Sequence, residues 1–136
     1  MKRTTIVVLG GLLLAGCAVQ GPDYEHIAPR SNKAAVYVYR TYPTAGFGSA
    51  AQQVVNCGDY SVALGPGGYH RFSIEPGEIL CSSHTENTAQ VQFTAKDGED
   101  YYVRQWFSIG WVLPHVFLEQ VEPDAAQKDL QTCKRQ

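Results

Sequence analysis

Short runs of alternating apolar and polar side chains, each closed by a turn, fill the chain from residue 34 onward. Residues 89–95 show the pattern most clearly: Ala, Val, Phe and Ala occupy the odd positions, and Gln, Gln and Thr lie between them. In an extended strand such residues point to opposite faces, whereas a helix would mix them. Turn signals stand between runs at Gly58-Asp59 and Asp97-Gly98. The pattern therefore predicts a chain built mainly of β-strands.

We predict seven or eight strands, over residues 34–40, 52–57, 60–64, 69–74, 78–84, 89–95, 100–107 and 116–121. Frequent turns between short strands are typical of an antiparallel β-sandwich of the immunoglobulin or transthyretin type. Residues 34–40 are apolar on both faces, which indicates a central strand. After Pro123 the spacing of Ala126, Leu130 and Cys133 changes to four and three residues, so we expect a short C-terminal helix that docks on the sheet.

Length and charge limit the classes of function. The chain has 136 residues, which suits one domain. Its formal net charge is −2 at pH 7. This charge argues against a surface that neutralises phosphates, so no nucleic-acid partner is expected.

The N-terminus has the pattern of an export signal. A Lys-Arg pair precedes an apolar run over residues 6–14, which is shorter than the roughly 20 residues that a membrane-spanning helix needs. The sequence Leu14, Ala15, Gly16, Cys17 follows and resembles the lipobox of bacterial lipoproteins. The resemblance implies that residues 1–16 are removed as a signal peptide and that the Cys17 thiol carries diacylglycerol. The alternative is an ordinary secretory signal with an unrelated cysteine.

The lipobox also predicts where the domain is held. Residue 18 is Ala rather than Asp, as in Gram-negative lipoproteins that are sent on to the outer membrane. We therefore expect attachment to the periplasmic face of the outer membrane through the N-terminal lipid. Residues 17–33 have no periodicity and contain several Gly and Pro residues, so they are expected to form a lipidated, flexible tether. Residues 34–136 would form the sandwich domain.

Several short motifs follow one another along the domain, each occurring at one place. They are Tyr-Val-Tyr-Arg at 37–40, Gly-Tyr at 68–69, Arg-Phe at 71–72, Glu-Pro-Gly-Glu at 75–78, Thr-Glu-Asn at 85–87 and Tyr-Tyr-Val-Arg at 101–104. This order resembles a family of small bacterial lipoproteins known only as a domain of unknown function. The chain departs from that family in its first hairpin, where Asn56-Cys57 precedes the glycine. Because the family has no assigned reaction, the resemblance implies no catalytic residue.

Three cysteines remain if Cys17 carries lipid. An oxidising compartment favours a disulfide, and we expect it between Cys57 and Cys81, which lie in neighbouring hairpins. Cys133 would then pack in the helix face or pair with a second chain. Three reduced thiols are the alternative.

No catalytic or metal-binding set is evident. A zinc site needs three or four convergent ligands, and the spacing of Cys81 and His84 puts these residues on opposite faces of a strand. No serine lies in the Gly-x-Ser-x-Gly turn of a hydrolase. We therefore predict no catalytic residue, no metal and no cofactor.

One strongly apolar segment does not fit a buried strand. It contains Trp106 and continues into a loop over residues 108–114 that holds Trp111 and Leu113. These three side chains are either exposed contacts for a partner or membrane, or part of a loop that folds over the sandwich end and closes the core.

These observations favour a membrane-anchored binding or envelope-assembly module that contacts another envelope protein and is not an enzyme. A small periplasmic hydrolase or carbohydrate-acting enzyme using His70 or His84 is one alternative. An inhibitor or immunity protein is another.

Overall fold

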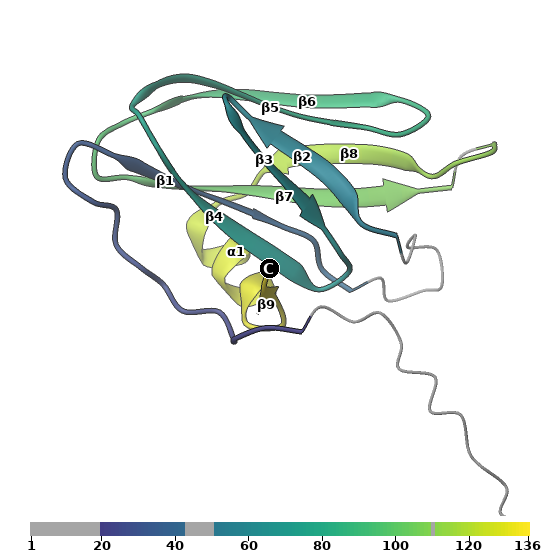
Figure 1. Cartoon of the computed structure of the whole chain (residues 1–136), viewed down its shortest axis with the longest axis horizontal. Helices are drawn as coiled ribbons and strands as arrows, with labels where there is room; N and C mark the ends of the chain where they lie inside the picture. The colour runs from purple at the N-terminus through teal and green to yellow at the C-terminus, as the bar shows by residue number, and fades with distance from the viewer. Residues whose placement is uncertain (1–19, 43–50, 110) are drawn as a thin grey trace, which may run out of the picture.

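The computed structural model describes residues 20–42, 51–109 and 111–136. In these residues two β-sheets face each other, and one short helix lies on the outer side of the larger sheet (Figure 1). The elements are β1 (Ala34–Tyr39), β2 (Gln53–Cys57), β3 (Tyr60–Leu64), β4 (Gly68–Ile74), β5 (Gly77–His84), β6 (Thr88–Ala95), β7 (Asp100–Ser108), β8 (His115–Gln120), α1 (Pro123–Leu130) and β9 (Lys134–Arg135). The predicted β-sandwich with a C-terminal helix is confirmed.

The five-stranded sheet has the order β8-β7-β1-β4-β9, and the four-stranded sheet has the order β3-β2-β5-β6. Two pairings differ from the antiparallel prediction, because β1 pairs with β7, and β4 with β9, in parallel. The ninth strand was not predicted either. It has only two residues, and two residues are too few to show an alternating pattern.

The glycine turns form as expected. Gly98, at φ 76°, turns the chain between β6 and β7. Gly67, at φ 71°, follows Pro66 in the turn before β4, and a Cβ there would lie 2.2 Å from the ring of Tyr42. Gly67 therefore requires a residue without a side chain, whereas at Gly98 the positive φ favours glycine and no neighbour blocks a side chain.

β1 lies in the middle of the larger sheet and is buried on both faces, as its apolar composition predicted. Its even-numbered side chains join the core between the sheets. This inner core includes Val36, Val38, Val55, Phe72, Ile74, Ile79, Phe93, Tyr101 and Val103. Its odd-numbered side chains point outward and form a second cluster, whose members include Ala35, Tyr37, Tyr39, Tyr69 and Tyr102, beneath the buried face of α1 (Ala126 and Leu130) and the adjoining Cys133.

The predicted disulfide is present. Cys57 and Cys81 are directly opposite in the β2–β5 register, and both point into the inner core with no exposed surface. The remaining cysteine, Cys133, is a free thiol and is 1% exposed. Of the two alternatives for Cys133, the structure therefore supports packing in the helix cluster over pairing with a second chain.

The segment before β1 differs from the flexible tether expected over residues 17–33. Residues 21–33, here called the N-terminal strap, run along the outer face of the larger sheet (Figure 1). The Tyr24 ring meets the Tyr37 and Tyr69 rings edge-on at 5.9 and 5.5 Å, and the backbone N–H and C=O of Ile27 both bond to the Tyr37 hydroxyl. An eight-residue helix leaves part of this aromatic face uncovered, and the strap covers the rest.

Candidate functional site

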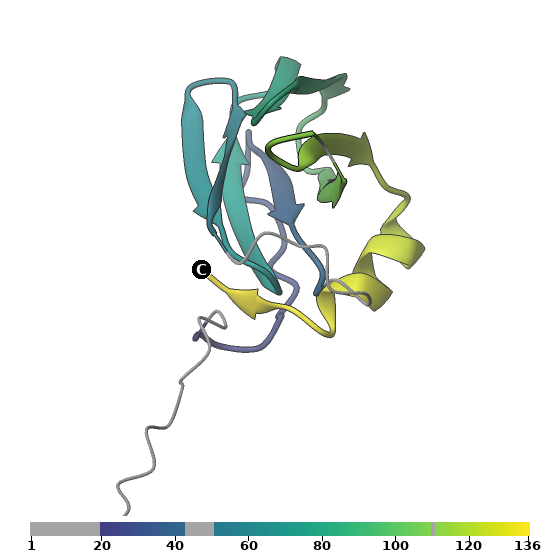
Figure 2. The same ribbon diagram turned by 90° about the vertical axis from the view of Figure 1, so that its right-hand side faces the viewer.

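The turn between β7 and β8 holds the most exposed apolar side chains of the described residues. Trp111 is 96% exposed, Val112 86%, Ile109 69% and Leu113 53%. We call these four residues the aromatic tip. The turn projects from one end of the molecule in Figure 1 and faces the viewer in Figure 2. The loop side chains are therefore exposed and do not fold over the sandwich end to close the core.

Trp106 is separate from the tip. It lies on β7, is 40% exposed and stacks on Phe117 of β8 with 4.1 Å between ring centroids. The structure thus brings together two of the three predicted contact residues, Trp111 and Leu113, and sets Trp106 back along the hairpin.

A buried arginine closes this end of the inner core in place of the loop. The Arg40 guanidinium lies over the Phe107 ring at 4.4 Å and donates to the carbonyls of Ala51 and Leu64. Burial lowers the pKa of Arg40 to about 10, so the group stays protonated at neutral pH. Arg40 and Phe107 thus occupy this end of the core, and the tip side chains stay exposed.

Side chains of the β5–β6 turn hold the β7–β8 hairpin next to its own turn. The Asn87 side chain accepts a hydrogen bond from the Val116 N–H and donates one to the Val116 carbonyl, both at 2.8 Å. The Thr85 hydroxyl donates to the Pro114 carbonyl at 2.7 Å. The Asn87 amide therefore acts as a strand partner for the edge strand β8 and ties the two sheets together at the tip.

Sequence reasoning missed this clamp. The Thr-Glu-Asn motif at residues 85–87 belongs to the resemblance to small bacterial lipoproteins, and that resemblance implies no contact for it. The middle residue adds an electrostatic contact, since the Glu86 carboxylate lies 3.4 Å from the His115 ring. The charged Glu86 thus lies beside the first residue of β8, whereas the four residues of the tip carry no charge.

The other histidines have separate partners. His26 contacts Asp100 at 2.6 Å, His70 Nδ1 contacts the Gln136 carbonyl at 2.8 Å, and the exposed His84 contacts Thr88 at 2.8 Å. Among the residues described, no group of three His, Cys, Asp or Glu side chains could hold a metal ion.

A small cavity lies between the N-terminal strap and the larger sheet. Its volume is about 180 Å³, and it is lined by Glu25, Ile27, Tyr37, Tyr69, His70, Arg71 and Arg135. Pockets for drug-sized ligands span roughly 300–1,000 Å³, so this one has room only for a smaller molecule.

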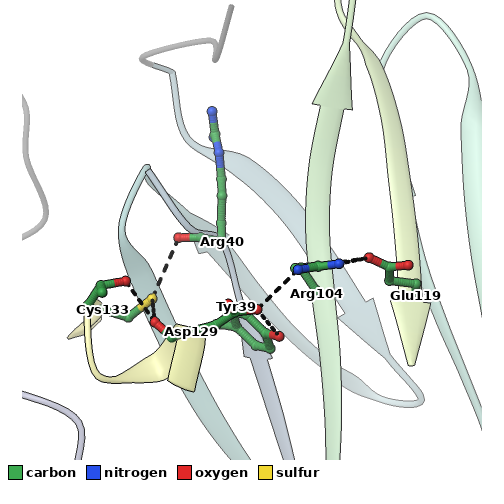
Figure 3. Close-up of polar contacts among 7 residues, drawn as sticks. Tyr39, Arg40, Arg104, Glu119, Asp129 and Cys133 are labelled. Atoms are coloured by element: carbon green, nitrogen blue, oxygen red, sulfur yellow. Dashed lines mark hydrogen bonds and ion pairs between the residues drawn. The ribbon is translucent and has the colours of Figure 1, made fainter. Parts of the chain in front are cut away.

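A polar network on the outer face holds α1 in place (Figure 3). Asp129 Oδ2 accepts from the Tyr39 hydroxyl at 2.9 Å and from Arg104 Nη1 at 3.1 Å, and Arg104 Nε donates to Glu119 at 2.8 Å. Burial raises the pKa of Tyr39, and the Asp129 carboxylate raises it further. Burial also raises the pKa of the Cys133 thiol, to about 11. We assign these groups to fold stability rather than to chemistry.

Comparison with known proteins does not identify a family. No protein-family model matches the chain, and neither does any curated protein. The lipobox residues Leu14, Ala15, Gly16 and Cys17 lie outside the described residues. Within the part of the chain that is described, no helix combines the length and apolar character that crossing a membrane requires.

Proposed function

We propose that this chain is a lipid-anchored protein of the bacterial cell envelope that acts as a non-catalytic binding or assembly module. Its anchor is diacylglycerol on Cys17, and its place is the periplasmic face of the outer membrane. Its contact surface is the aromatic tip. The observation that carries the proposal is the 96% exposure of Trp111 on a clamped hairpin, because soluble domains rarely leave large apolar groups clustered in water without a binding role.

The strap supports a position close to the membrane. The Arg135 N–H donates to the Pro22 carbonyl at 2.8 Å, and Asp23 forms an ion pair with Lys134. With Pro22 bonded to the domain, four residues of sequence separate this contact from Cys17. The domain is then held near the bilayer instead of at the end of a long tether.

The histidine contacts favour binding over hydrolysis. His70 lines the strap cavity, but its Nδ1 is engaged by the carbonyl of Gln136, and the cavity is small. His84 is on the exposed surface beside Thr88, where a reacting group would not be sheltered from water.

Intact-mass analysis of the membrane fraction tests the anchor. In a bacterium that acylates lipoproteins, we expect a chain that begins at Cys17 and carries diacylglycerol. Cys17→Ser should abolish the modification, whereas the matched control Cys133→Ser should retain it. An intact leader, or an unmodified soluble product in the wild type, would contradict the proposal.

The destination has its own test. If Ala18 lets the lipoprotein proceed to the outer membrane, Ala18→Asp should shift it to the inner membrane in density fractionation. An unchanged distribution would remove this part of the proposal.

A further inference from the structure

We infer that the aromatic tip inserts into the surface of the bilayer that carries the chain's own lipid anchor. This inference rests on the proposed function, since it takes Cys17 as the anchored residue. The tip is proposed to contact the lipid–water interface. The evidence for this is the position, chemistry and rigidity of the tip.

The strand register places the tip and the start of the strap at the same end of the larger sheet. Arg104 of β7 pairs with Tyr39, Tyr39 with Tyr69, and Tyr69 with Arg135. The Arg135 N–H bonds to Pro22, so Pro22 lies in the same row across the sheet as Arg104. β7 continues for four residues beyond this row, to Ser108, before the tip begins.

The length of β7 beyond the row of Pro22 can be compared with the reach of the chain from Cys17 to Pro22. β7 continues about 13 Å beyond the row that contains Pro22, so the start of the tip lies at about that distance. The five peptide steps from Cys17 to Pro22 span at most about 17 Å. The lipid on Cys17 can therefore reach the plane in which β7 ends and the tip begins, so one bilayer surface can contact both.

The chemistry of the tip suits a lipid interface. Tryptophan is enriched at the boundary between hydrocarbon and water, and the three neighbours of Trp111 in the tip are aliphatic. Removal of the leader would leave a mature chain with 9 basic and 13 acidic side chains, a net charge of −4. Attraction to anionic headgroups therefore cannot drive this contact, and we expect it to persist at high salt.

The anchor and the clamp both lower the cost of the contact. A tip tethered to the bilayer by lipid experiences a high effective concentration of membrane, so a small apolar area is sufficient. Asn87 and Thr85 bond to the hairpin next to its turn, so the tip keeps a fixed position and less conformational entropy is lost on contact.

The test uses the full lipidated chain, reconstituted into vesicles of phosphatidylethanolamine and phosphatidylglycerol with bromine on the acyl chains. Trp106→Phe leaves Trp111 as the single tryptophan, and Trp111→Phe leaves Trp106. We expect bromolipid to remove roughly half of the Trp111 emission, because an interfacial ring touches the upper acyl chains. We expect clearly less quenching of Trp106, which is set back on the strand.

A charge placed in the tip provides the matched comparison. In the Trp106→Phe background, Leu113→Asp should abolish most of the quenching of Trp111. Leu80→Asp introduces the same charge at a similarly exposed position on β5 and should leave it unchanged.

Flotation separates the two proposals. A chain that floats with the vesicles while Trp111 escapes bromolipid and is quenched by aqueous acrylamide overturns the inference and leaves the anchor intact. A tip shielded from both quenchers also overturns it, in favour of a protein contact. A wild-type chain that does not float refutes the anchor and the inference together.

Discussion

Removing the Cys57–Cys81 disulfide should lower the free energy of unfolding by about 3.5 kcal/mol. The two cysteines are 24 residues apart, so the bond closes a loop of 25 residues in the unfolded chain. In the chain-entropy model, a loop of that length loses about 12 cal/mol/K, which is about 3.5 kcal/mol at 25 °C. Because both side chains point into the inner core with no exposed surface, Cys57→Ala with Cys81→Ala should also leave a small void, which adds to the loss.

Urea unfolding followed by tryptophan fluorescence measures this effect. With a slope of about 1.5 kcal/mol per M, the midpoint of the double variant should fall by about 2 M. Reductant should shift the wild type in the same direction and leave the double variant unaffected. Cys133→Ala is the control and should remain sensitive to reductant. A loss below about 1 kcal/mol, or a peptide map that joins Cys133 to another cysteine, would refute the reasoning.

Three further predictions follow from the polar contacts. Asn87→Asp keeps the acceptor for the Val116 N–H but places a carboxylate oxygen against the Val116 carbonyl, so thermal unfolding should show a loss of about 1–3 kcal/mol; unchanged stability would exclude the clamp. Tyr39→Phe removes one hydrogen bond to Asp129 and should cost about 0.5–1.5 kcal/mol, with a double-mutant cycle against Asp129→Ala showing coupling; additive losses would contradict the network. Burial raises the pKa of Cys133 from 9.0 to about 11, so its contribution to stability is complete below pH 9 and is lost as the pH rises through about 11; Cys133→Ala should flatten that part of the stability profile, and an identical profile would contradict the assignment.

The local parts of the fold could be predicted because they depend on neighbours in the chain. Alternation along residues 89–95 located β6, and glycine turns located the β2–β3 hairpin at Gly58 and the connection from β6 to β7 at Gly98. The double-sided apolar run at residues 34–40 identified the central strand. In each case a few adjacent residues decide which face of a strand is apolar or where the backbone turns.

The candidate site could be predicted only in part. The composition of residues 106–113 marked an unusual apolar segment, but composition does not say whether a loop folds over the core or away from it. Arg40 decides this, because its guanidinium and the Phe107 ring close that end of the core. The Asn87 clamp was also invisible, since it joins residues 29 positions apart on different sheets.

The sequence by itself located the eight longer strands, the turns between several of them and the docking face of the helix, and it favoured the pair of cysteines that bond, because these follow from short-range periodicity and the positions of few residues. The tertiary structure alone decided the two parallel pairings, the strap over the aromatic face and the exposure of Trp111. Those features depend on which sheet edges and faces remain uncovered once the core has formed, and burial of distant surfaces is not encoded in any local pattern.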